Sequence, residues 1–418
     1  MGIITNLFSI KNTGKHIIFS FGKLKLRFNF KRTFGFLNKL WIPFIQVKPN
    51  KIVFSNYAGK SYGCNSKYIA EEILNQNLPY DIVWLVSDVE KEKEHFPKQI
   101  RLVHYHSFAA FKELASAKVW VNNTRKNYFW ECGLVKKNNQ LYIQTWHGSL
   151  GIKKMEGDIL NEDSNWRRWS KVDSKNIDYI LSNSKFDDEH YKAGFWYDGP
   201  IVRTGHPRND VFFKNEDEKQ LIKDRVYSAL NIQKDAKIIL YVPTFRDDGD
   251  VSCYDIDVEK FTAEMNKKFG GNCVFVTRLH PNVSPEKCAL INNENVVNAN
   301  SYPDIQELLA ASEFVVSDYS SCMFDFMLMT KPVFIYATDI DKYNTDRGFY
   351  YPLESTPFPI AVNNNELLEN VLNFDKEAYI KKVEKFLIDF DCTDDGQASK
   401  NVVKIIKKFI DEDVKYYE

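Results

Sequence analysis

Short apolar runs alternate with helical stretches along most of the chain, and this rhythm limits its possible folds more than any other feature. The rhythm starts near Lys51 and restarts near Lys237, after a polar, charged stretch at 211–236. Such alternation favours a parallel sheet with helices on both faces. A length of 418 residues exceeds one ordinary domain and suits two of about 200 residues. We therefore predict two doubly wound α/β domains in succession.

The pattern divides the chain into four parts. Residues 1–50 form a basic, aromatic-rich segment, 51–212 and 213–390 form the two domains, and 391–418 contain an amphipathic closing helix. In open α/β sheets, ligands bind beyond the carboxyl ends of the strands. Two domains that face each other leave a cleft between those ends, so the residues that follow the strands are the candidates for chemistry.

Charge is unevenly spread although the formal net charge is zero. Residues 1–70 contain twelve Lys or Arg and no Asp or Glu, whereas residues 71–418 carry 44 basic and 56 acidic side chains. Zero net charge argues against a nucleic-acid-binding protein, and a basic, apolar start suits an anionic membrane surface. The alternative is a strand or helix packed on the core with a solvated basic face. No apolar run approaches the length that spans a bilayer, about 20 residues.

Motifs for several common cofactors are missing from the sequence. The chain has no phosphate-binding P-loop, no GxGxxG after the first strand, and no HExxH or Cys/His cluster. These absences exclude a P-loop NTPase and argue against a dinucleotide dehydrogenase or a zinc site. Seven scattered cysteines without a CxxC pair favour reduced thiols in the cytosol. We expect neither a metal nor a cofactor.

Polar clusters follow five predicted strands at their carboxyl ends. Three of the eight histidines, His147, His206 and His280, stand at such exits. A single histidine near a core is more often structural, but histidine, arginine and serine at many exits together indicate a phosphate site. The other candidates at these exits are Gly148, Arg208, Asn209, Asp210, Arg246, Arg278, Ser317, Asp318, Ser320 and Ser321.

The arginines and serines of these clusters suit an anionic ligand. Arg246 and Arg278 can clamp phosphate oxygens bidentately. Ser320 and Ser321 precede a predicted apolar helix at 322–329, and the N terminus of a helix attracts anions. Structural alternatives stay open, namely an ion pair for Arg246 and helix caps for the serines.

Two of the histidines suit the proton and charge movements of group transfer. His147, beside Gly148, can accept the proton of an attacking hydroxyl, because imidazole titrates near neutral pH. His280, if it carries a charge or donates a proton, would stabilise a leaving phosphate. Phosphoryl transfer needs little beyond such positioning and charge stabilisation.

Short motifs occur in a fixed order along the chain: Trp146-His147-Gly148, Lys153-Lys154, 205–210, 243–247, His280-Pro281, 317–321, Phe324-Asp325, Lys331-Pro332, 341–343 and 347–350. In these motifs, between residues 51 and 390, the chain resembles the CDP-glycerol glycerophosphotransferase family, which builds teichoic acids and related capsular polymers in bacteria. It departs from the common pattern at 149–151, where many members read Thr-Pro-Leu, and at His206.

The resemblance implies a GT-B-like fold, with an acceptor domain at 51–212 and a CDP-donor domain at 213–390. It also implies that His147 is the base and that His280 stabilises the donor phosphates. Further donor contacts are implied for Ser317, Asp318, Ser320, Ser321 and Arg347, while Gly148, Lys153, His206, Arg208, Asn209 and Asp210 are expected to support the cleft.

The implied reaction moves glycerol phosphate or ribitol phosphate from a CDP-polyol to a hydroxyl of a lipid-linked teichoic acid or capsular polymer and releases CMP. The acceptor is expected on a polyprenyl diphosphate at the cytoplasmic face of the bacterial membrane, where residues 1–50 would hold the protein peripherally. Two alternatives stay open: a GT-B glycosyltransferase that uses a nucleotide sugar, and a non-catalytic scaffold at the membrane surface. The sequence does not distinguish glycerol from ribitol.

Overall fold

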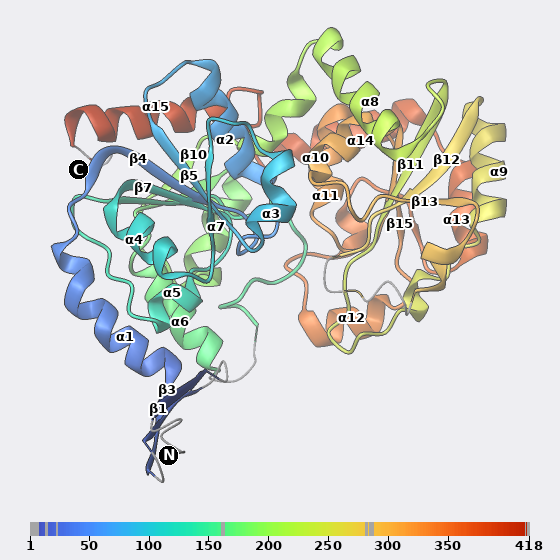
Figure 1. The fold of residues 1–418 in the computed structure, drawn as a ribbon. Helices are drawn as coiled ribbons and strands as arrows, with labels where there is room; N and C mark the ends of the chain where they lie inside the picture. The colour runs from blue at the N-terminus through green and yellow to red at the C-terminus, as the bar shows by residue number, and fades with distance from the viewer. Residues whose placement is uncertain are drawn as a thin grey trace.

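Two parallel sheets, each with helices on both faces, lie side by side in the computed structural model of the chain (Figure 1). The structure describes residues 8–12, 16–21, 24–159, 164–280, 283, 288–413 and 415. The first sheet has the strand order β10-β9-β8-β7-β4-β5-β6, and the second has the order β13-β12-β11-β14-β15-β16. Every strand pair within these two sheets is parallel. The prediction of two doubly wound α/β domains is therefore confirmed.

The strands of the two sheets are short. The first sheet contains β4 (Lys48–Ser55), β5 (Asp81–Val86), β6 (Arg101–His104), β7 (Ala117–Asn122), β8 (Leu141–Gln144), β9 (Tyr179–Ser182) and β10 (Ile201–Arg203). The second contains β11 (Ala236–Val242), β12 (Asn272–Thr277), β13 (Val296–Asn298), β14 (Phe314–Ser317), β15 (Val333–Tyr336) and β16 (Ile360–Ala361). The central strands are continuous buried runs, as expected for a sheet covered on both faces.

Helices connect the strands and cover the sheets. In the first domain these are α2 (Cys64–Asn75), α3 (Val89–Glu92), α4 (Phe108–Ser116), α5 (Asn127–Glu131), α6 (Asn165–Ser174) and α7 (Lys185–Gly194). In the second they are α8 (Glu216–Leu230), α9 (Val258–Phe269), α10 (Ile305–Ala311), α11 (Cys322–Phe326), α12 (Ile340–Arg347), α13 (Asn364–Leu372) and α14 (Lys376–Asp389). Several begin at a Ser, Asp or Asn whose side chain accepts a backbone N–H of the first turn.

The last helix, α15 (Ala398–Glu412), returns to the first domain and lies beside α2 (Figure 1). Its apolar face, with Val402, Ile406 and Phe409, belongs to the same core as Ile52 and Ile69. The chain therefore crosses between the domains twice. The 3-10 segment Pro207–Phe213 leads out of the first domain, and the stretch before α15 leads back.

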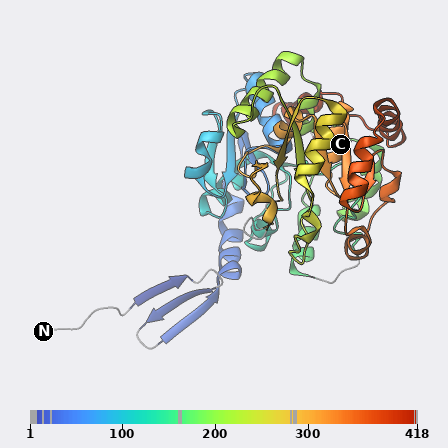
Figure 2. The ribbon, with the colours of Figure 1, turned by 90° about the vertical axis from the view of Figure 1, so that its right-hand side faces the viewer.

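The basic N-terminal segment contains a small antiparallel sheet of its own, made of β1 (Phe8–Asn12), β2 (His16–Phe21) and β3 (Leu24–Asn29). It projects from the body of the molecule and leads into α1 (Phe30–Trp41) (Figure 2). Residues 1–7, 13–15 and 22–23 of the predicted membrane segment lie outside the described residues. Within the described part of the chain, no helix is both long enough and apolar enough to cross a bilayer.

Candidate active site

A cavity of about 450 Å³ opens beyond the carboxyl ends of the second sheet and receives one side chain from the first domain. Its described lining combines cationic and aromatic side chains with carboxylates. These residues are Lys153, Phe245, Arg246, His280, Lys342, Tyr343, Arg347, Asp247, Asp248, Asp339 and Asp346, together with Thr244. Lys153 is the contribution of the first domain. Its presence makes the cavity a feature of the cleft between the domains.

A larger cavity, of about 800 Å³, lies where α2, α8 and α10 approach one another. Its described lining residues include none of the predicted site residues. Lys67 in its wall is buried and already paired with Asp304 and Glu307, at 2.9 and 2.6 Å. Size alone therefore does not identify the reaction site, and the smaller cavity is the better candidate.

His147 lies three residues after the end of β8, and Trp146 before it adopts a left-handed conformation with φ 51°. Its Nδ1 lies 2.6 Å from the carbonyl oxygen of Asn123. Because a carbonyl only accepts, Nδ1 carries the proton in the neutral ring and Nε2 keeps its lone pair. Burial lowers the pKa of His147 to about 4, with Arg208 and Lys153 adding to the effect. A neutral ring with a free Nε2 suits a general base.

His280 follows β12 and lies on the cavity wall, where its ring stacks on Phe245 with 5.6 Å between the ring centroids. Loss of solvent lowers the pKa of His280 to about 4, followed by the charges of Lys153 and Lys60. This ring is therefore neutral at pH 7. The charge of Lys153 also lowers the pKa of His147, and His280 has the same effect on it.

Lys153 reaches the cavity because its segment pairs with the second domain. It forms an antiparallel bridge with Phe349, and the N–H of Lys154 donates to Gly348 O at 3.0 Å. Burial lowers the pKa of Lys153 to about 8, and the charge of Arg347 is the next largest cause. Two cations that approach each other in a cavity form a place for an anion.

Arg347 ends α12 at the same cavity. Its Nε is buried and has no hydrogen-bond partner among the residues that the structure describes. A buried guanidinium nitrogen is rarely left unpaired, so an anionic ligand is a natural partner for it. This placement agrees with the donor contact expected for Arg347.

The other two arginines of the predicted donor site are engaged by the protein. Arg246 donates to both carboxylate oxygens of Asp339, at 2.7 and 2.9 Å, and pairs with Asp318 at 2.9 Å. Arg278 donates to the carbonyl oxygens of Ala299, at 3.1 Å, and Tyr302. In this arrangement Arg246 lines the cavity, and Arg278 is held by backbone carbonyls outside the described lining. A bidentate phosphate clamp would require Arg246 to leave its carboxylates.

The serine-rich segment after β14 has a buried half and an accessible half. Ser317 and Asp318 are buried, and Asp318 accepts the backbone N–H of Thr244 at 2.8 Å. Ser320 and Ser321 are half-buried, and in the described structure the side chain of Ser321 makes no cap bond to α11. The predicted helix at 322–329 is α11 followed by a 3-10 turn, so its N-terminal dipole is weaker than the sequence suggested.

The motifs of the two domains meet at Gly148. A Cβ atom at this glycine would lie 3.3 Å from Ser321 Oγ, so the backbone of the first domain approaches the second as closely as a side chain allows. The segment that carries His147 and the serine-rich segment are therefore in contact across the domain boundary, although neither is among the described lining residues of the cavity.

The 206–210 motif supports this interface from behind. Arg208 is 2% exposed and forms a bidentate pair with Asp325, at 2.9 and 3.0 Å, across the domain boundary. Asn209 donates to Asp394 at 2.9 Å, and Asp210 accepts the backbone N–H groups of Ala398 and Ser399 at the start of α15. Burial raises the pKa of Asp210 to about 6.

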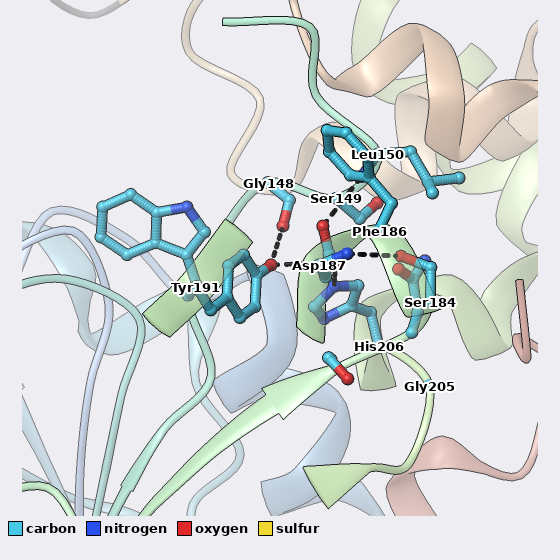
Figure 3. A network of polar contacts seen from close by, with 12 residues as sticks. Gly148, Ser149, Leu150, Ser184, Phe186, Asp187, Tyr191, Gly205 and His206 are labelled. Carbon is cyan, nitrogen blue, oxygen red and sulfur yellow. Dashed lines mark hydrogen bonds and ion pairs between the residues drawn. The ribbon is translucent and has the colours of Figure 1, made fainter. Parts of the chain in front are cut away.

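His206 is fully buried and lies away from the cavity lining. Its ring Nε2 faces Asp187 Oδ2 at 3.4 Å (Figure 3). Its backbone N–H donates to Asp394 Oδ1 at 2.7 Å. His206 was expected to support the cleft. It contacts Asp187 in the core and does not line the cavity.

Sequence reasoning missed two residues that contact His147. The ring of Tyr57 meets the imidazole edge-on at 5.3 Å between centroids, and Asn123 orients Nδ1. Both follow strands, β4 and β7, so their place at a strand exit was the available signal. Tyr57 and Ala58 are also left-handed, with φ 43° and 55°, which only the structure reveals. Within the described residues, no group of three or more potential metal ligands gathers.

Comparison with known proteins gives a consistent result. The family profile described as CDP-Glycerol:Poly(glycerophosphate) glycerophosphotransferase matches residues 38–408. The chain is 32% identical over 380 residues to the teichoic acid poly(glycerol phosphate) polymerase of Staphylococcus epidermidis, which covers 88% of this chain and 52% of that protein. It is 30% identical over 416 residues to the teichoic acid glycerol-phosphate transferase of Staphylococcus aureus, which covers 96% and 100%. The chain thus spans about half the length of the first relative.

A solved structure of the wall teichoic acid polymerase TagF matches with a TM-score of 0.79 and 31% identity, over 92% of this chain and 95% of that one. Ribitol-phosphate enzymes also occur among the relatives. The structural match confirms the GT-B-like fold.

Proposed function

Because the chain belongs to the CDP-glycerol:poly(glycerophosphate) glycerophosphotransferase family, we propose that it transfers a polyol phosphate from a CDP-polyol to a wall or capsular polymer. The acceptor group is a hydroxyl on a lipid-linked chain, and CMP is released. Relatives that use glycerol phosphate and ribitol phosphate both occur, so the donor is CDP-glycerol or CDP-ribitol. The observation that carries this proposal is that the first domain reaches the second at two points, with Lys153 in the cavity beside His280 and Arg347 and with Gly148, next to His147, against Ser321.

The reaction needs one proton transfer and one displacement at phosphorus. The acceptor oxygen attacks the phosphorus that carries the polyol, and His147 Nε2 takes the hydroxyl proton. The bond from phosphorus to the CMP oxygen breaks, and CMP leaves with the electron pair. Lys153 and Arg347 lie where the diphosphate would be held, and His280 would stabilise the leaving charge.

A donor screen tests the reaction class. CMP release from CDP-glycerol or CDP-ribitol, with a lipid-linked acceptor, supports the proposal, whereas UDP release from a UDP-sugar would support a glycosyltransferase. No binding of any CDP ligand would support a non-catalytic scaffold. The variant His147→Ala should keep donor binding and lose turnover by about 100-fold or more. His104→Ala, on the exposed edge strand β6, is the matched control. A near wild-type rate in His147→Ala would remove His147 from the base role.

We also propose that the protein docks on an anionic membrane surface, where a polyprenyl-diphosphate-linked acceptor would lie. Helix α1 and the 3-10 turn that follows it at Ile42–Phe44 support this. Phe36 on α1 and Phe44 on the turn are 65% and 87% exposed, with Leu37 and Leu40 also exposed, while Ile42 is buried. Exposed aromatic and leucine side chains in a segment with basic and no acidic residues suit a lipid surface.

A further inference from the structure

The loop that carries His147, residues 145–150, is held in a conformation that the chain does not favour by itself. Two of its non-glycine residues, Trp146 and Leu150, are left-handed, with φ 51° and 50°. Such residues cost free energy and persist only where surrounding contacts hold them. The contacts that hold this loop therefore also determine where the imidazole stands.

Asn65, Asp325 and Tyr351 hold parts of this loop. One further carboxylate, that of Asp187, approaches it from α7 (Figure 3). Asp187 Oδ1 accepts the backbone N–H of Leu150 at 3.3 Å. Asp187 Oδ2 lies 3.0 Å from the hydroxyl of Tyr191, and that hydroxyl lies 3.1 Å from Gly148 O. Asp187 thus holds the Leu150 flank of Ser149 directly. On the other flank, the single proton of the Tyr191 hydroxyl is shared between Asp187 Oδ2 and Gly148 O, both of which only accept.

Asp187 is itself held rigidly. It lies in the first turn of α7, where its backbone N–H donates to the cap residue Ser184 at 3.1 Å. A negative charge is favoured at this end of a helix. His206 Nε2 faces Asp187 Oδ2 at 3.4 Å from the opposite side, and Asp394 fixes the backbone of His206.

Asp187 is only 2% exposed, so its carboxylate is withdrawn from solvent. Burying a carboxylate is unfavourable unless donors surround it. Here the donors are the Leu150 N–H, the Tyr191 hydroxyl and the His206 ring. Two of these three act on, or through, the loop that carries His147.

We propose that Asp187 is a positioning residue for the base: it fixes residues 148–150 and so holds His147 Nε2 in line with the acceptor hydroxyl. The inference rests on the base role proposed for His147. Asp187 is not among the described lining residues of the cavity, so it acts on the reaction through the loop. The position of the His147 ring matters for the rate, because a displacement of a reacting group by about 1 Å can lower the rate about 100-fold.

The variant Asp187→Asn keeps the shape but replaces one accepting oxygen by an NH₂ group. It should lower kcat about 10- to 100-fold, the usual effect of losing a supporting partner, and leave the KM for the CDP-polyol unchanged. The donor cavity is lined by other residues, so a defect in positioning appears in kcat alone. The variant Tyr191→Phe, which removes the link to Gly148 O, should lower kcat by less.

Asp188→Asn is the matched control. Asp188 lies in the same turn of α7, and its carboxylate pairs with Ser182 and Arg203, 2.9 Å from Arg203 Nε. This variant should keep the wild-type kcat. If Asp187→Asn fails to fold, Tyr191→Phe still tests the proposal, and a wild-type kcat in that variant would overturn it.

A double variant separates this inference from the proposed function. With His147→Ala already present, Asp187→Asn should cause no further loss of rate, because the two residues act as one unit. A further loss of equal size would make Asp187 a general structural residue and overturn the proposal. Full activity in His147→Ala would refute the base role itself. A slow His147→Ala together with a wild-type Asp187→Asn would refute the positioning role alone.

Discussion

Lys153 gives the cleft a titration that can be moved by one substitution. Burial and the charge of Arg347 lower its pKa to about 8, so it loses its charge within the range in which the enzyme can be assayed. The change is Lys153→Arg, because a guanidinium stays protonated at all such pH values. We expect the alkaline limb of kcat/KM for the CDP-polyol to disappear in this variant.

The size of the effect follows from the pKa. Lys153 binds the anionic donor in its protonated form, which is complete below pH 7 and lost as the pH rises through about 8. At pH 9, one unit above, about one tenth of the lysines remain charged, so kcat/KM should fall about tenfold from its plateau. In Lys153→Arg the same rise in pH should leave kcat/KM within about twofold.

The assay is CMP release at low donor concentration, measured between pH 6 and 9.5 as about eight points. Lys342→Arg is the control, since Lys342 lines the same cavity but is exposed and paired with Asp248 at 2.6 Å. That pairing raises the pKa of Lys342, so this variant should keep the wild-type profile. An alkaline limb that persists in Lys153→Arg would show that another group titrates and would refute the reasoning.

Two further predictions concern the domain interface and the membrane. Arg208→Ala leaves the buried Asp325 without its bidentate partner. This variant should lower the free energy of unfolding, measured in urea, by about 3–5 kcal/mol. The control Arg203→Ala, at a more exposed ion pair, should lower it by less than about 1 kcal/mol, and equal losses would contradict this prediction. Replacing Phe36 and Phe44 together by Ser should reduce sedimentation of the protein with anionic vesicles, whereas the exposed control Leu221→Ser, on α8, should not. Unchanged binding of the double variant would exclude α1 and the turn after it as the membrane contact.

The strands and helices of the two domains could be predicted because double-sided burial leaves a local pattern. The rhythm that restarts near Lys237 begins within one residue of β11, Ala236–Val242, and the central strands are continuous buried runs. The N-terminal sheet could not be predicted in the same way. Its residues mix basic and apolar types, which fit either a strand or a helix, and the pairing of β1 with β2 and β3 is not a local property.

The candidate site was predictable in its positions and less so in its partners. Strand exits located His147 and His280 near one cleft, because the carboxyl ends of parallel strands meet at one edge. The partners of the arginines are set by tertiary packing. Arg246 meets Asp339, 93 residues away, and Arg208 meets Asp325, 117 residues away. Nothing local to either arginine distinguishes a residue that binds ligand from one that binds a distant carboxylate.

His147 and His280 are both neutral at pH 7. The proposed reaction, however, requires a positive charge on His280. The pKa of His280 is lowered by loss of solvent and then by Lys153 and Lys60. A donor diphosphate beside Lys153 would offset that repulsion and add an attraction of its own, so its arrival raises the pKa of His280. His147 responds in the opposite sense, because a charge on His280 lowers the pKa of His147 further.

Donor binding would thus separate the two rings into a charged stabiliser and a neutral base without any change in the protein. The order of events follows from this separation. His147 is neutral with or without the donor, so the donor's contribution is the charge on His280. A donor that binds first has this charge in place when the acceptor hydroxyl arrives. Product inhibition by CMP that is competitive with the CDP-polyol and not with the acceptor would agree with this order, and the reverse pattern would contradict it.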